Sequence, residues 1–306
     1  MSSASARPVP AAPPTRTIEL DIPVHYREWE SAGGDATFVL VPGLGGSSLN
    51  WMLAAPLLTP RGRVLAPDLA GQGYTQRGGR ASSLDANREL LEDFIAAISD
   101  RPVVLGGNSM GGALAILEAA AAPDRVEALV LVDPALPAFG EVDPMVAQTF
   151  AAYSTPGVGE ELIRQFEETF GPEGMVRTVM DMVTYDSSRI PEEVLQAHVD
   201  QLREQMAGGG RGDAFLESAR TLVELLTDPD RLRAAWEAVK APTLLVTGDS
   251  DRLVPPVAPQ TLADLRPDWT FEVLDHVGHV PQLEDPERFV RITGDWLDRQ
   301  GVAPAA

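Results

Sequence analysis

The sequence predicts an α/β fold, in which a doubly wound, mostly parallel sheet carries a helical segment inserted between two of its strands. Short apolar runs recur along the chain and stop at Pro, Gly or Asp, and helical patterns separate them. Between residues 137 and 240 the strand-like runs cease while helical patterns continue. Continuous apolar strands that end in loops are typical of a parallel sheet covered on both faces.

Length and composition favour a large packed core. The 306 residues suffice for one large domain with an insertion or for two ordinary domains, and 44% of them are hydrophobic. We expect the core at residues 16–136 and 241–300 and the helical insertion at 137–240. An insertion at this point lies over the carboxyl ends of the strands, where ligands bind, so we interpret it as a lid.

Charge and cysteine content exclude several classes of function. The formal net charge is −21, and such a surface repels nucleic acid and anionic lipid. The chain has no cysteine, which excludes disulfides, thiolate catalysis and cysteine-ligated metals. We therefore expect a small-molecule substrate as the partner, with no nucleic acid and no membrane, and the oligomeric state stays open.

The first residues, "MSSASARPVPAAPPTR", are small and Pro-rich, and they lack the apolar stretch of a secretory signal. We expect residues 1–15 to form a disordered tail. No later stretch approaches the length of a membrane span, so a cytoplasmic protein is expected.

The strands are expected in a clear order along the chain. Thr17–Glu30 alternates apolar and polar residues, as one half-buried edge strand would. The buried strands are expected within "ATFVLVPG", "RVLAPD", "PVVLGGNS", "EALVLVDP", "APTLLVTGD" and, more weakly, "FEVLDHVGH".

Helices are expected between these strands, at Leu84–Ile98, Gly111–Ala121, Ala258–Leu265 and Pro286–Arg299. Further helical patterns lie in the insertion, namely "GEELIRQFEETF", "PEEVLQAHVDQLREQM", "AFLESARTLVELL" and "PDRLRAAWEAV". The Gly-rich Ala207–Asp213 is expected to be a flexible connection.

The stretch "GNSMGG" places Ser109 where a buried strand turns into a helix. Such a sharp turn crowds its neighbours, and Gly107, Gly111 and Gly112 relieve the crowding because they lack a Cβ. The turn lifts the hydroxyl clear of the sheet, in front of a helix amino terminus that favours negative charge. Ser109 is therefore the candidate nucleophile, although an incidental serine in a Gly-rich turn is the alternative.

A serine nucleophile needs a histidine base, and the chain has four histidines. His25 falls in the first edge strand and His198 in a helical pattern of the insertion, where structural roles are expected. In "LDHVGHVPQLEDPERF", Gly278 precedes His279 at the end of the last strand, where a loop would present the ring. We favour His279 as the base, with His276 as the rival.

The acid that orients this histidine should follow an earlier strand. "LLVTGDSDRLVPP" offers Asp249 and Asp251, and "LVLVDPALP" offers Asp133. Asp251 lies further along its loop and can turn back toward a histidine, whereas Asp249 suits hydrogen bonds to turn amides. We favour Asp251 as the acid, with Asp133 as the rival.

These residues resemble the α/β-hydrolase family in its lidded serine hydrolase branch. The resemblance covers Thr17 to Arg299 and rests on "VPGLGGSSLNW", "GNSMGG", "GDSDRLVP" and "GHVPQLEDPERF", in the family's order of serine, acid and histidine. It implies an oxyanion hole made by the backbone N–H groups of Leu44 and Met110. Pro42 stands where the family usually has a histidine, which removes that residue's bracing hydrogen bonds but not the Leu44 donor.

The resemblance implies a triad of Ser109, His279 and Asp251 that cleaves a carboxylic ester through an acyl-enzyme, with no cofactor and no metal. An apolar acyl or aromatic substrate is expected. "GNSMGG" also resembles the carbon–carbon bond hydrolases of ring-cleavage pathways, although Val280 follows His279 where those enzymes carry an aromatic residue. A cofactor-free perhydrolase or a family member repurposed for a non-hydrolytic step are further alternatives.

Two other classes of protein remain to be weighed. Gly43-Leu44-Gly45 after a strand, with Asp68 ending the next strand, imitates the fingerprint of a nicotinamide-dependent oxidoreductase. Its third glycine is replaced by Ser48, and this interpretation leaves the three triad residues unexplained. A catalytically inactive scaffold is the other class, and the intact triad argues against it.

Overall fold

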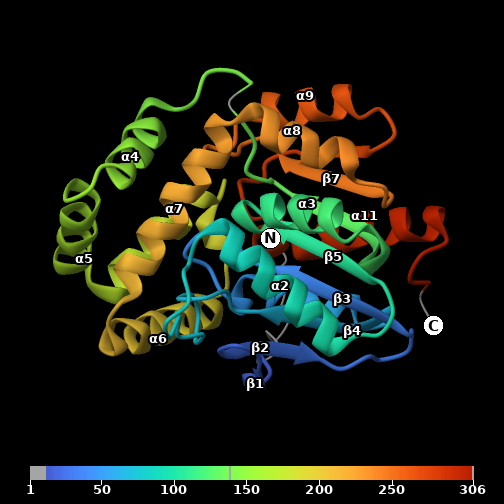
Figure 1. The fold of residues 1–306 in the computed structure, drawn as a ribbon, viewed down its shortest axis with the longest axis horizontal. Helices are drawn as coiled ribbons and strands as arrows, with labels where there is room; N and C mark the ends of the chain where they lie inside the picture. Colours follow the sequence, from blue (N-terminus) through green and yellow to red (C-terminus); the bar gives the residue numbers. More distant parts are fainter. Residues whose placement is uncertain (1–11, 138, 305–306) are drawn as a thin grey trace, which may run out of the picture.

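An eight-stranded sheet forms the centre of the structure, a computed structural model that describes residues 12–137 and 139–304 (Figure 1). The strands are β1 (Arg16–Glu19), β2 (Pro23–Trp29), β3 (Ala36–Val41), β4 (Gly62–Pro67), β5 (Val103–Asn108), β6 (Val126–Val132), β7 (Thr243–Gly248) and β8 (Thr270–Leu274). Their order in the sheet is β1-β2-β4-β3-β5-β6-β7-β8. All neighbours pair in parallel except β1 with β2 and β2 with β4, which confirms the mostly parallel sheet.

The first edge of the sheet differs from the expectation. One strand was expected over Thr17–Glu30, but the chain turns at residues 20–22 and forms the antiparallel pair β1 and β2. The alternation of apolar and polar residues continues through the turn, and for that reason periodicity alone could not locate the break.

The two faces of the sheet bury alternate side chains of the same strands. Val39, Leu105 and Leu245 belong to the core on one face, whereas Leu40, Val104 and Val246 belong to the core on the other. Strands β3, β5 and β7 are buried at every residue. This double burial is the physical reason why their sequences are continuous apolar runs.

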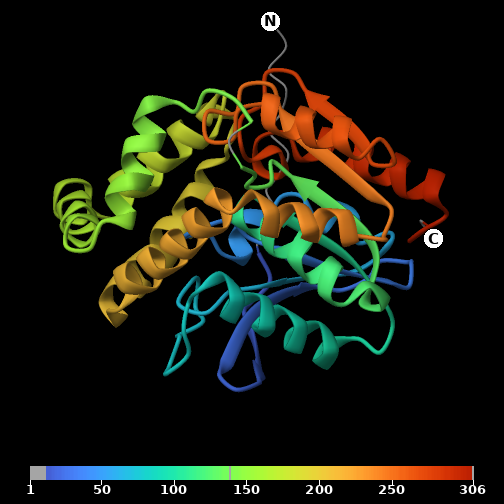
Figure 2. The ribbon, with the colours of Figure 1, turned by 45° about the horizontal axis from the view of Figure 1, so that its top comes forward.

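Helices cover both faces and confirm the doubly wound architecture (Figures 1 and 2). One face carries α2 (Leu84–Ile98), α3 (Met110–Ala121), α8 (Pro229–Ala238) and α9 (Val257–Leu265). The other face carries α1 (Ala55–Leu58), α10 (Pro281–Glu284) and α11 (Pro286–Gln300), together with the 3-10 turn η1 (Ser48–Trp51). Two further 3-10 turns are η2 (Pro123–Arg125) and η3 (Ser187–Arg189).

Between β6 and β7 the described residues contain helices and no strand. The helices are α4 (Pro144–Ser154), α5 (Val158–Val183), α6 (Glu192–Gly208), α7 (Arg211–Thr227) and α8. Helix α5 is kinked at Gly171, where φ is 58°, and the following Pro172 has no N–H to donate. A flexible connection was expected over Ala207–Asp213. The actual connection is much shorter, because α6 ends at Gly208 and α7 begins at Arg211.

Helices α4 to α7 stand together beyond one end of the sheet (left in Figures 1 and 2), whereas α8 packs on α3 over the sheet. Helix α4 buries none of its residues, whereas Leu232 and Trp236 of α8 belong to the same core as the sheet. The insertion therefore changes from an exposed outer part at α4 to an integral part of the core at α8.

Most of the expected disordered tail over residues 1–15 lies outside the described residues. Within the described part, the carbonyl of Pro13 accepts a hydrogen bond from the Arg27 guanidinium. No helix in the described ranges has the length and hydropathy needed to cross a membrane.

Glu118 of α3 is a charged residue in the middle of the core. Its side chain is fully buried, and one carboxylate oxygen lies 2.9 Å from the Arg88 guanidinium of α2, whereas the other oxygen has no partner among the described residues. Burial raises the pKa of the Glu118 carboxyl to about 7, although the nearby Arg88 acts to lower it. Protonated Glu118 thus stabilises the fold relative to the ionised form.

This raised pKa makes stability depend on pH. Because the folded-state pKa lies above the unfolded value, the contribution of Glu118 is present at acid pH and is lost as pH rises through about 7. Glutamine carries no titratable group, so Glu118→Gln should not lose this contribution. We expect the unfolding free energy of Glu118→Gln, measured relative to that of the wild type, to be about 2 kcal/mol higher at pH 8 than at pH 5. Urea denaturation at both pH values measures the difference.

Glu92→Gln is the matched control, because Glu92 pairs with the same Arg88 but is 48% exposed. Its stability relative to the wild type should change little between the two pH values. The same pH dependence in both variants would place the effect on the arginine rather than on Glu118.

Candidate active site

Ser109 lies at a strained turn between β5 and α3. Its backbone has φ 57° and ψ −121°, a conformation that a residue with a Cβ adopts only when its surroundings impose it. A Cβ on Gly107 would lie 2.1 Å from the carbonyl oxygen of Gly111, and one on Gly111 would lie 2.4 Å from that of Val41. The glycines on both sides of Ser109 therefore permit the tight turn that presents its hydroxyl.

A buried hydrogen bond joins the predicted base to the predicted acid. His279 Nδ1 lies 2.6 Å from Asp251 Oδ2, and the two residues are 3% and 6% exposed. Because an ionised carboxylate only accepts, Nδ1 is the donor and Nε2 keeps a lone pair for a proton. The other oxygen of Asp251 accepts the backbone N–H groups of Leu253 at 2.7 Å and Val254 at 3.1 Å, which fixes the carboxylate.

Asn108, the residue before Ser109, connects this pair to the elbow. Its Nδ2 donates to the carbonyl of His279 at 2.9 Å and to that of Val132 at 3.1 Å. His279 Nε2 is buried and has no hydrogen-bond partner among the described residues, so the Ser109 hydroxyl is not bonded to it here. Such bonds commonly tighten only when substrate binds, so the missing bond does not disqualify the pair.

The His279 loop is fixed by Glu284, which the sequence analysis did not single out. One carboxylate oxygen of Glu284 accepts the N–H groups of Gly278 at 2.7 Å and Tyr185 at 3.0 Å, and the other accepts that of Asp186 at 2.8 Å. The N–H of His279 itself donates to the carbonyl of Val183 at 2.7 Å. The end of α5 is thereby bound directly to the loop that carries the histidine.

The predicted oxyanion loop lies against Ser109. A Cβ on Gly43 would be 3.1 Å from the Ser109 Cβ, which places the adjoining Leu44 next to the elbow. Met110 is the first residue of α3, so its N–H is a helix donor without a partner inside the helix.

Two further residues hold the oxyanion loop in place. Buried Asp68 accepts the N–H groups of Ser48 at 2.7 Å and Tyr74 at 2.8 Å, and burial raises the pKa of its carboxyl. The Ser47 hydroxyl lies 2.5 Å from Gln201 Oε1 on α6. The loop is thus attached both to the core and to the inserted helices.

The rival histidines lie outside this arrangement. His25 is on β2, and the Nδ1 atom of His198 lies 2.8 Å from the carbonyl of Val194 within α6. His276 follows β8 with φ 58° and stacks on Tyr185, with ring centroids 5.3 Å apart. None of these three imidazole rings is bonded to a carboxylate among the described residues.

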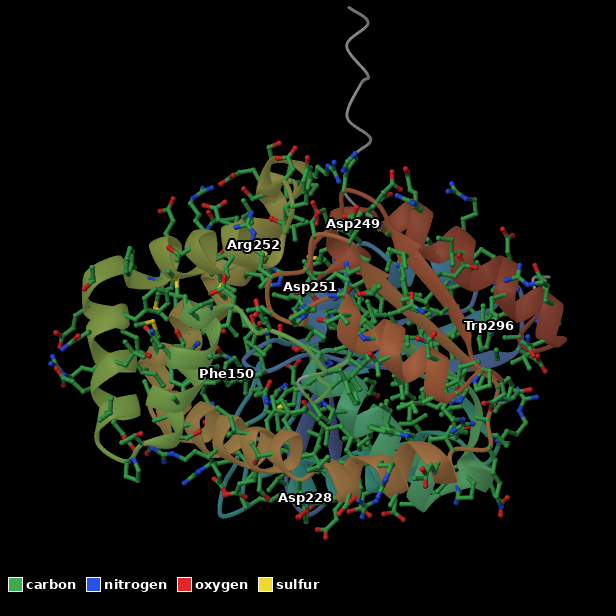
Figure 3. The ribbon with its side chains drawn as sticks, turned by 90° about the horizontal axis from the view of Figure 1, so that it is seen from above. Phe150, Asp228, Asp249, Asp251, Arg252 and Trp296 are labelled. Atoms are coloured by element: carbon green, nitrogen blue, oxygen red, sulfur yellow. The ribbon has the colours of Figure 1, made fainter. Side chains whose placement is uncertain are left out.

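The rival acids differ from each other. Asp249 is exposed and accepts the backbone N–H of His276 at 2.8 Å, whereas Asp251 is buried, and both lie on the loop that follows β7 (labelled in Figure 3). Asp133, at the end of β6, is fully buried, and it offers a carboxylate oxygen within 4.8 Å of ligand atoms of Asp251 and His279. The structure therefore brings both Asp133 and Asp251 to the histidine.

This trio is the group in the described chain that could hold a metal ion. The Nδ1 atom of His279 and one oxygen of Asp251 are already bonded to each other, which leaves few ligand atoms for a cation.

The dinucleotide interpretation also fits poorly. The loop at Gly43–Gly45 leads into the short 3-10 turn η1, and the Asp68 carboxylate is occupied by backbone amides.

Comparison with known proteins gives the following matches. A model of the "Alpha/beta hydrolase family" matches residues 38–292. The chain is 29% identical over 280 residues to the 2-hydroxy-6-oxo-6-(2'-aminophenyl)hexa-2,4-dienoic acid hydrolase of Metapseudomonas resinovorans, covering 90% of this chain and 89% of that one. It is also 29% identical to a haloalkane dehalogenase of Mesorhizobium japonicum, over 97% of this chain and 96% of the other.

A solved structure shares the fold. The haloalkane dehalogenase DatA from Agrobacterium tumefaciens superimposes with a TM-score of 0.79 at 22% identity, covering 94% of this chain and 97% of that chain. At this identity the likeness concerns the fold alone.

The elbow geometry predicts the effect of one added methyl group. We expect Gly111→Ala to lower the free energy of unfolding by about 2–4 kcal/mol, because its Cβ would meet the carbonyl oxygens of Val41 and Pro42 at 2.4 and 2.5 Å. Gly79→Ala is the control, since a Cβ there has no neighbour within 4 Å. Chemical denaturation measures both. A Gly111→Ala protein as stable as Gly79→Ala would contradict the tight turn.

Proposed function

This chain belongs to the alpha/beta hydrolase family, and we propose that it is a serine hydrolase that cleaves a carboxylic ester through an acyl-enzyme intermediate. The observation that carries the proposal is the buried 2.6 Å bond between His279 and Asp251, which leaves His279 Nε2 without a partner among the described residues, on a loop whose carbonyl is bonded to Asn108, the residue before Ser109. A histidine held in this tautomer can act as a general base, because its Nε2 lone pair can accept a proton.

The proposed reaction assigns one role to each residue. His279 Nε2 takes the hydroxyl proton of Ser109 as the oxygen attacks the ester carbonyl, and then gives it to the leaving alcohol. Asp251 keeps the ring oriented and stabilises the imidazolium that forms. A water activated by the same nitrogen then hydrolyses the acyl-enzyme and releases the acid.

The negative charge on the tetrahedral intermediate needs donors fixed in advance. We assign this role to the N–H groups of Leu44 and Met110, because the Gly43 loop lies against Ser109 and Met110 begins α3. Two such donors contribute about 3–4 kcal/mol each to transition-state stabilisation. Pro42 precedes this loop and supplies no donor, so the hole depends on the residues after it.

The inserted helices place aromatic side chains next to the oxyanion loop. Phe215 of α7 is half-buried, and its ring would lie 3.0 Å from a Cβ on Gly45. Tyr153 packs edge-on against Phe215 at 5.2 Å, and Phe150 against Tyr153 at 5.9 Å. We propose that α4–α7 act as a lid whose aromatic wall receives an apolar acyl or aromatic group.

Carbon–carbon bond hydrolysis is the second candidate, and the relatives favour it. The Metapseudomonas relative is named for a hexadienoic acid substrate, and a 2-hydroxymuconate semialdehyde hydrolase of Pseudomonas is 26% identical over 258 residues. A substrate acid brings a carboxylate into the pocket. The half-buried Arg211 of α7 is already paired with Glu167 at 3.2 Å, which favours a neutral substrate. A hydrolysis screen with p-nitrophenyl esters and with 2-hydroxy-6-oxo-dienoic acids discriminates the two reactions.

The nucleophile is tested by its removal. We expect Ser109→Ala to lower kcat by about 10⁶-fold, because the oxyanion hole and the binding site alone sustain little turnover. The variant should also lose labelling by an organophosphonate, as followed by intact-protein mass spectrometry. Ser250→Ala is the control, since the hydroxyl of Ser250 donates to the neighbouring Asp249, outside the proposed triad. Near-normal turnover by Ser109→Ala would exclude this serine as the nucleophile.

The lid assignment predicts a change in substrate preference. We expect Phe215→Ala to lower kcat/KM for long-chain or aromatic esters about 10–100-fold more than for acetate esters, because it removes the wall beside the oxyanion loop. Phe170→Ala is the control, since this lid side chain is 47% exposed. Equal losses for short and long esters would show that Phe215 supports the loop and does not select the substrate.

A further inference from the structure

Two carboxyl groups meet behind the imidazole of His279, where one would suffice. Asp133 follows β6 and Asp251 follows β7, and these strands are parallel neighbours in the sheet. Ligand atoms of Asp133, Asp251 and His279 all lie within 4.8 Å of one another. Both aspartates are buried, Asp133 completely.

The hydrogen bonds of the two aspartates are unequal. Asp251 accepts three N–H donors, from His279, Leu253 and Val254, at 2.6–3.1 Å. For Asp133, one oxygen accepts the Thr247 hydroxyl at 2.6 Å and the Gly248 N–H at 3.1 Å, whereas the second has only the Gly248 N–H at 3.4 Å. Asp251 is therefore the better stabilised anion, and one oxygen of Asp133 is left almost without a donor.

Charge balance leads to the same distinction. No arginine or lysine of the described chain forms an ion pair with either aspartate, so two adjacent carboxylates would face a single imidazole. Like charges this close in a buried site cannot both persist, and one carboxyl keeps its proton.

We propose that Asp133 is a positioning residue, which stays protonated at neutral pH and donates its hydrogen bond to Asp251, so that the pair carries one negative charge toward His279. The role of His279 in this proposal rests on the proposed function. The protonation state of the Asp133–Asp251 pair does not depend on it. The Asp133 backbone is held at φ 42°, and its N–H donates to the carbonyl of Val246 at 2.9 Å, which fixes the carboxyl in this orientation.

Electrostatics supports this state of the pair. Burial, and after it the adjacent charge of Asp251, raises the pKa of Asp133 well above its ordinary value. The titratable groups that the structure places against Asp133 are Asp251, from the β7 loop, and His279, from the β8 loop. A second charge here would favour imidazolium at His279, and a protonated ring could not accept the proton of Ser109.

The test follows the imidazole titration of His279 by NMR and needs no substrate. With four histidines in the chain, the signal missing from His279→Gln identifies it. We expect Asp133→Asn to move the titration midpoint of His279 by less than about half a pH unit, because a neutral amide replaces a neutral carboxyl group. Asp251→Asn removes the charge and should lower the midpoint by at least about one unit. Asp249→Asn is the matched control, because this acid bonds the His276 N–H outside the pair.

A fall of a unit or more in Asp133→Asn, or no fall in Asp251→Asn, would overturn the proposal, since Asp133 would then carry the charge. Asp133→Ser provides the same neutral replacement if the amide variant does not fold. Infrared spectroscopy gives a second measurement at neutral pH. The C=O band of a protonated carboxylic acid, present in the wild type and in Asp249→Asn, should lose intensity in Asp133→Asn, and an unchanged band would contradict the proposal.

These outcomes are distinguishable from failure of the proposed function. If the titration behaves as expected but Ser109 does not react with an organophosphonate, the protonated pair stands and the hydrolase assignment falls. If Ser109 reacts but the midpoint falls in Asp133→Asn, the hydrolase assignment stands and the protonated Asp133 is excluded.

Discussion

Parallel pairing of four adjacent strands, β5 to β8, is the constraint on which the site depends. Their carboxyl ends meet at one edge of the sheet, so Ser109, Asp133, Asp251 and His279 come together although 170 residues separate the first from the last. The pairing is fixed by residues buried on both faces, since a one-residue slip would turn every apolar side chain to the wrong face. The same burial that sets the register thus sets the spacing of the chemical groups.

Burial of polar groups at this edge requires that nearly every one has a partner. Asn108 and Glu284 satisfy the backbone around His279, and Asp251 receives two amides besides the imidazole. His279 Nε2 is one of the buried atoms left without a partner among the described residues, and the carbonyl of His279 is bonded to Asn108, the residue before the strained turn of Ser109. A buried imidazole that a carboxylate orients, on a loop bonded to a strained turn that carries a serine, is an arrangement that a purely structural role would not explain.

The sequence predicted the buried strands and the four core helices well, because double burial leaves an unbroken apolar run and amphipathic helices leave a clear period. It predicted the elbow because the glycines around Ser109 have a steric reason. It could not show that Asp133 and Asp251 meet, or that Glu284 binds the end of α5 to the His279 loop. These contacts join segments far apart in the chain and leave no local pattern. For the same reason the packing of α8 on the core was not visible in the inserted segment.

The central claim is that Ser109 becomes covalently acylated during turnover, and peptide mapping of an acyl-enzyme tests it most directly. A slowly hydrolysed aryl ester is mixed with the wild-type protein, quenched with acid and digested, and the peptides are sequenced by mass spectrometry. The account predicts that the acyl mass lies on Ser109, and that Asp251→Asn forms this species more slowly. Turnover with the acyl group on another residue, or with no covalent adduct during an observed burst of product, would contradict it.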